Sequence, residues 1–285
     1  MAQPVTLFAW AVPAWDSESP VDHTWVTSYD NRIHAYATIT EVVGANQFFW
    51  YCWGSFHAVG GTPLNPNGFL GQQSGDLAVA QCLVRPNLDP RTSSLARGTV
   101  YHYGVDGVCH QLANQVLYAS SLGSGQPITV DNARGYLLSN FIYGTYGLQQ
   151  TAWSSKVASC TSQHLAAGPA RPEGLRMAQD EPLPEADEFE KRAMALLAGQ
   201  PAKLGRLLQL RGEVQQFAAR AWPGSGQPGA LALNARNQEL IDEAARLLGP
   251  DDFRKLFGAD AGARVNLVDP HIANSAGDIP PPKRR

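Results

Sequence analysis

Residues 108–120 read VCHQLANQVLYAS, and their apolar side chains recur at the spacing of one face of an α-helix. That face carries Cys109, Leu112, Ala113, Val116 and Leu117. Asp106 and Gly107 come just before the run, as a helix N-terminal cap would. The pattern therefore predicts a helix over residues 108–120, with Cys109 in its first turn.

The chain up to about residue 160 is rich in aromatic and β-branched residues and in glycine, which is typical of short strands separated by turns. We expect strands over residues 5–12, 23–29, 33–43, 47–53, 98–103 and 136–146. Residues 60–76, GGTPLNPNGFLGQQSGD, predict a long surface loop. Residues 76–84 fit either a helix capped by Ser74 or a buried strand.

The composition changes after residue 160. Residues 161–187 are rich in Ala, Pro, Glu and Gly and predict a linker. Residues 188–258 carry helical apolar patterns, the last of them started by Pro250, and residues 259–285 predict an extended or disordered tail. The sequence thus predicts an α+β fold, in which an antiparallel sheet with a cysteine-bearing helix over residues 1–160 is followed by an α-helical C-terminal region.

The overall composition argues against several classes of protein. A formal net charge of −3 with 44% hydrophobic residues favours a packed core over nucleic-acid binding. The chain has no stretch of about 18 consecutive apolar residues and no basic N-terminal region, so we expect neither a membrane span nor a secretion signal. The cysteines are far apart and form no C-x-x-C pair: Cys52, Cys82, Cys109 and Cys160. We therefore expect free thiols, a cytoplasmic location, and no metal or organic cofactor.

Cys109 is the first candidate for chemistry because of its predicted place at a helix N-terminus. The positive end of the helix dipole and the free backbone N–H groups there favour a thiolate over a thiol. The same N–H groups can form an oxyanion hole. The competing interpretation is a packing residue, since cysteines on apolar helix faces are commonly part of a core.

A thiolate nucleophile also needs an imidazole that acts as base and then as acid. His23, in VDHTWVTSY, begins a predicted strand that can lie against the Cys109 helix. His110 is adjacent to Cys109, and neighbouring helical residues point in different directions. The other candidates lie before the helix, in the linker and in the tail: His102, His164 and His271. His23 is the predicted base, and a pairing of Cys109 with His271 is an alternative.

The order of a histidine on a strand, a returning strand and a cysteine at a helix start resembles the circularly permuted branch of the papain-like NlpC/P60 superfamily. The resemblance covers residues 20–120. It implies a cysteine peptidase, amidase or acyltransferase with Cys109 as nucleophile and His23 as base. It also implies that a polar residue of the next turn or strand orients the imidazole, with His34 favoured over Asp30.

The predicted function is therefore a thiol hydrolase or acyltransferase that acts on an amide or ester bond of a peptide or small molecule, through an acyl-thioester on Cys109. Trp25, Tyr103 and His110 are predicted to contact the substrate. The alternative is a non-enzymatic protein whose aromatic domain binds a ligand or peptide, while the helical region docks a protein partner or a second copy. A further hypothesis is that the segment after Ala259 lies across the cleft and inhibits it.

Overall fold

A small antiparallel sheet forms the base of the molecule in this computed structural model. The structure describes residues 4–13, 20–28, 68–76, 79, 103–121, 127–148, 155, 158–159, 162, 187–220 and 228–269. The strand order is β2–β1–β3, with β1 (Pro4–Pro13), β2 (Asp22–Ser28) and β3 (Phe69–Asp76). Together with the helices this confirms the α+β fold class. Strands β1 and β2 confirm the predictions for residues 5–12 and 23–29. The strands predicted at residues 33–43 and 47–53, and all but the last residue of 98–103, lie outside the described residues.

Strand β3 corrects the prediction of a surface loop for residues 69–76, whereas residues 60–67 of the predicted loop lie outside the described residues. Glycine is depleted in strands, but here close packing requires it, because a Cβ on Gly75 would lie 2.4 Å from Cδ1 of Leu7. Gln73 supports the strand from its partly buried side chain, whose Nε2 donates to the carbonyl of Leu117 at 2.7 Å. Close packing against Leu7 therefore explains why a glycine occurs at position 75 within a strand.

Ser74 lies within β3, opposite Thr6 in the ladder with β1, so it does not cap the segment that follows. The cap is Asp76, whose Oδ1 accepts a hydrogen bond from the backbone N–H of Val79 at 2.9 Å. A carboxylate that accepts a hydrogen bond from the backbone N–H three residues later is the usual pattern of a helix N-cap. Position 79 is helical.

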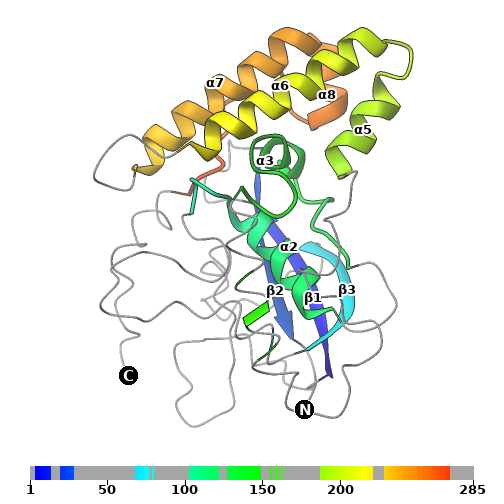
Figure 1. Ribbon diagram of the computed structural model, residues 1–285, viewed down its shortest axis with the longest axis vertical. Helices are drawn as coiled ribbons and strands as arrows, with labels where there is room; N and C mark the ends of the chain where they lie inside the picture. Colours follow the sequence, from blue (N-terminus) through cyan, green and yellow to red (C-terminus); the bar gives the residue numbers. More distant parts are fainter. Residues whose placement is uncertain are drawn as a thin grey trace.

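Helix α2 (Cys109–Ser120) confirms the predicted cysteine-bearing helix and lies across the sheet, in contact with β2 and β3 (Figure 1). Its N-cap residue is Val108, not Asp106 or Gly107. The backbone N–H of Val108 donates to Oε1 of Gln111 at 3.0 Å. Val108 is therefore the N-cap residue, and Cys109 is the first helical residue.

Helix α3 (Tyr136–Tyr143) stands where the sequence predicted a strand over residues 136–146, so that prediction is wrong. Every side chain of the helix is buried, the polar Ser139 and Asn140 included. Over so few residues, periodicity does not distinguish a buried strand from a buried helix. The helix starts after Gly135, whose φ of 74° is in the left-handed region, and its C-cap is Gly144.

Four helices form the C-terminal part: α5 (Glu188–Leu196), α6 (Pro201–Ala219), α7 (Ala230–Leu248) and α8 (Pro250–Phe257). Pro250 starts α8, as predicted. Figure 1 shows these helices on one side of α3, with α2 and the sheet on the other. Buried apolar residues of the sheet, α2, α3 and the four helices form one continuous core. In the described part of the chain, no helix is long and apolar enough to cross a membrane.

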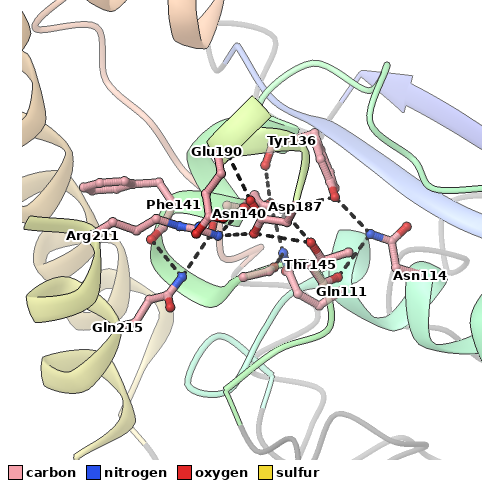
Figure 2. Close-up of polar contacts among 12 residues, drawn as sticks. Gln111, Asn114, Tyr136, Asn140, Phe141, Thr145, Asp187, Glu190, Arg211 and Gln215 are labelled. Carbon is pink, nitrogen blue, oxygen red and sulfur yellow. Dashed lines mark hydrogen bonds and ion pairs between the residues drawn. The ribbon is translucent and has the colours of Figure 1, made fainter. Parts of the chain in front are cut away.

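A buried arginine ties α3 to α5 and α6 (Figure 2). Arg211 of α6 is 7% exposed, and its Nη1 lies 2.9 Å from a carboxylate oxygen of Glu190. Its Nη2 donates to Oδ1 of Asn140 at 2.8 Å and also to the carboxylate of Asp187. The guanidinium carbon lies 4.8 Å from the ring centroid of Phe189. The helical region is therefore held to the first half by a desolvated charge network as well as by apolar packing.

Candidate active site

Cys109 occupies the first position of α2, and its side chain is 2% exposed. Its Sγ lies 4.0 Å from the backbone carbonyl of Asp22, the residue before His23. The backbone N–H groups in the first turn of a helix have no intrahelical acceptor and carry partial positive charge. The thiol therefore sits where a negative charge on sulfur is favoured.

His23 lies on β2, opposite Val12 in the ladder with β1, and β2 packs against α2. Its Nε2 is 3.0 Å from Oδ2 of Asp269, and Cys109 lies near enough to raise the pKa of the imidazole. Burial by itself lowers the pKa of His23, but the hydrogen bonds and charges of Asp269 and Cys109 outweigh burial and raise it to about 9. The imidazole is therefore a cation at neutral pH, held between a carboxylate and a thiol.

Asp269 is the site residue that the sequence interpretation missed. It lies after α8, in a segment without helix or strand structure, and it is 1% exposed. Its backbone N–H donates to the hydroxyl oxygen of Tyr103 at 3.2 Å. The only sequence signal is an aspartate after the apolar run VNLV, close to His271, which was considered as a partner for Cys109.

Tyr103, predicted to contact the substrate, lies at the site and hydrogen-bonds the backbone of Asp269. It is 1% exposed and holds the backbone of Asp269. Burial, followed by the charges of Cys109 and Asp269, raises the pKa of Tyr103, so its hydroxyl keeps its proton. Tyr103 can thus donate a hydrogen bond as well as accept one.

His110 fixes the backbone beside the site. Its Nε2 is 2.9 Å from the backbone carbonyl of Asp22, and its Nδ1 is 2.8 Å from Oγ of Ser139. Burial first, and then the charge of His23, lower the pKa of His110 to about 4 despite the hydrogen bond to Asp22. His110 is therefore neutral at pH 7 and joins α2 to the start of β2 and to α3.

Asp22 anchors the start of β2 to Arg134. Its backbone N–H donates to the carbonyl of Arg134 at 2.9 Å. Its Oδ2 accepts from the backbone N–H of Arg134 at 3.0 Å, and its Oδ1 accepts from Nε of Arg134 at 2.8 Å. These bonds fix the strand residue that precedes His23, so the imidazole enters the site from a constrained backbone.

The remaining predicted site residues are only partly placed. Trp25 pairs with Trp10 in the ladder between β2 and β1. His34 and Asp30, the predicted orienting residues, lie outside the described residues. Within the described residues, no group of three or more His, Cys, Asp or Glu side chains could hold a metal ion. Among the predicted residues, the structure thus brings together Cys109, His23 and Tyr103, and it adds Asp269.

The buried neutral state of His110 predicts a loss of stability in acid. Because its folded pKa of about 4 lies below the ordinary 6.5, its contribution is present above pH 6.5 and is lost as the pH falls toward 4. Between about pH 7 and about pH 4, we expect wild type to lose on the order of 3 kcal/mol more unfolding free energy than His110→Gln. Urea unfolding of both proteins at the two pH values measures the difference.

His23 does not confound that comparison, because its contribution is common to both proteins. Its raised pKa stabilises the fold fully below pH 6.5, and this contribution is lost as the pH rises through about 9. Its change over the acid window therefore cancels in the difference between the two proteins. Parallel acid sensitivity in wild type and His110→Gln would contradict the neutral, hydrogen-bonded state of His110.

No protein-family model, no curated protein and no solved structure matches this chain.

Proposed function

We propose that this protein is a cysteine-nucleophile hydrolase or acyltransferase that acts on an amide or ester bond of a peptide or small molecule. The observation that carries the proposal is the contact between Cys109, at the first position of a helix, and a His23 imidazole whose other partner is Asp269. A nucleophile, a base and a group that orients the base are the parts that thiol catalysis requires.

In the first half of the reaction, the thiolate of Cys109 attacks the carbonyl carbon of the substrate. Electrons move onto the carbonyl oxygen, and the first-turn N–H groups of α2 stabilise that charge. The imidazolium of His23 then gives its proton to the departing amine or alcohol. The scissile bond breaks, and the acyl group remains on sulfur as a thioester.

In the second half, neutral His23 removes a proton from water or from an acceptor amine, which attacks the thioester. The thiolate leaves, the imidazolium is restored, and the product is an acid or a new amide. Asp269 keeps its contact with Nε2 throughout, which fixes the ring orientation and stabilises the imidazolium. Free thiol chemistry of this kind suits a reducing compartment, so we infer a cytoplasmic location.

The order of His23 and Cys109 supports the resemblance to the circularly permuted NlpC/P60 superfamily. The source of the orienting group differs from what that resemblance implies, since Asp269 comes from the segment after α8, not from the strand that follows His23. The proposed site therefore draws on both halves of the chain.

One observation favours a second candidate, a non-enzymatic ligand- or peptide-binding protein. The side chains of Cys109, His23 and Asp269 are 2%, 3% and 1% exposed, respectively. A substrate must reach the sulfur, whereas a binding protein can keep these groups as a buried polar cluster. The two candidates differ in whether Cys109 becomes acylated in the native state.

Acylation of the native protein tests the proposal. We expect p-nitrophenyl esters to release a burst of nitrophenol and to leave an acyl group on Cys109, detected by intact-mass and peptide mass spectrometry. Cys109→Ala should show neither the burst nor the adduct. An adduct on other residues, or none until the protein is unfolded, would put the binding protein first.

A further inference from the structure

The segment of residues 263–269, here called the strap, follows α8 without helix or strand structure and ends at Asp269. Its apolar side chains enter the common core, with Val265 2%, Leu267 3% and Val268 0% exposed. The strap is therefore an integral part of the fold, and it is the part that carries the carboxylate to His23.

Two amide side chains of α7, four residues apart and so on one face of the helix, bind the strap backbone. Asn234 donates from Nδ2 to the carbonyl of Val268 at 2.8 Å and accepts from the N–H of Val268 at 2.9 Å. Gln238 accepts from the N–H of Val265 at 2.9 Å and donates to the carbonyl of Ala263 at 3.3 Å. Each amide thus pairs with both a donor and an acceptor of the strap, as a neighbouring strand would.

Packing around Val268 sets the position of the strap along α7. A Cβ on Gly104 would lie 2.8 Å from Cγ1 of Val268 and 2.8 Å from Cδ1 of Leu233, so the three residues are in close contact. Val268 comes directly before Asp269, so these contacts fix the backbone from which the carboxylate extends.

We propose that Asn234 and Gln238 are positioning residues for the active site: they fix the register of the strap so that Asp269 meets His23. This inference rests on the proposed function for its catalytic meaning. It assigns a role to the helical region, since α7 holds the segment that completes the Cys109 site. Neither amide touches Cys109 or His23 in any hydrogen bond described here, so both act through Asp269.

The test compares the pKa of His23, measured by NMR titration of its imidazole, in wild type, Asp269→Asn and Asn234→Ala/Gln238→Ala. An opposite charge in contact raises a histidine pKa by roughly one pH unit or more. We expect both variants to lower the pKa of His23 from about 9 by about that amount. The matched control is Gln209→Ala, which removes an exposed amide from α6 and should leave the pKa unchanged.

The single variants Asn234→Ala and Gln238→Ala are measured as well, because each removes fewer hydrogen bonds than the pair and so disturbs the fold less. A lowered unfolding temperature with an unchanged pKa of His23 would show that the amides only stabilise the fold and would overturn the inference. The measurement does not depend on catalysis. Absence of an acyl adduct on Cys109 would remove the proposed function, whereas the His23 titration would still decide whether the amides position Asp269.

Discussion

Substituting His23 with alanine is expected to slow the alkylation of native Cys109 by iodoacetamide about 10²-fold near pH 6. A thiol without a partner has an ordinary pKa of about 8.5, so only about 0.3% of it is thiolate near that pH. The His23 imidazolium persists in the wild type up to about pH 9, and it stabilises a thiolate on the sulfur that it contacts.

Peptide mass spectrometry of one sample gives the alkylation rate of every cysteine, so Cys52, Cys82 and Cys160 serve as internal references. His271→Ala is the matched control, because His271 is the other histidine considered as a partner for Cys109. It should leave the rate unchanged, whereas Asp269→Asn should reduce it. Equal rates in wild type and His23→Ala, with reaction only after unfolding, would identify Cys109 as a packing residue.

Arg211→Ala is expected to destabilise the fold by about 3–5 kcal/mol, the usual cost of removing one partner from a buried ion network. The substitution leaves the carboxylates of Asp187 and Glu190 without the cation that neutralises them. It also removes the donor to Asn140 and the contact with the ring of Phe189. Unfolding in urea, followed by circular dichroism, measures the change.

Arg206→Ala is the control for this substitution, since Arg206 is an exposed arginine of the same helix. Exposed substitutions away from such networks change stability by no more than about 0.5 kcal/mol. Arg211→Lys keeps the charge but loses the planar fork that reaches two acceptors, so we expect a loss between those of the two alanine variants. A loss below about 1 kcal/mol for Arg211→Ala would mean that the network contributes little beyond an exposed ion pair.

Local patterns in the sequence correctly predicted the elements whose pattern extends over enough residues. Helix α2 repeats its apolar spacing over 12 residues, and strand β1 is a run bounded by prolines. The patterns failed in α3, whose 8 residues are too few to separate a helix from a strand, and where close packing selects glycine, as at Gly75. In those cases the neighbours, which lie far along the chain, determine the structure.

The charged residues of the helical region illustrate the same limit. Charged residues on helices are mostly exposed, and Arg206 is exposed. Arg211 is not, because α3 and α5 cover it and supply Asn140, Asp187 and Glu190 as partners. Sequence periodicity reports which residues share a helix face, but it does not report whether another element covers that face.

The sequence by itself determined that Cys109 would start a helix and that His23 would lie on a strand, because both follow from side-chain periodicity over a few residues. Only the tertiary structure decided that His23 contacts Cys109 and that Asp269 is its carboxylate partner. That partner is delivered by a strap whose register depends on Asn234 and Gln238 of α7. Such a contact joins opposite ends of the chain, and its energy comes from burial and hydrogen bonds that no local stretch contains.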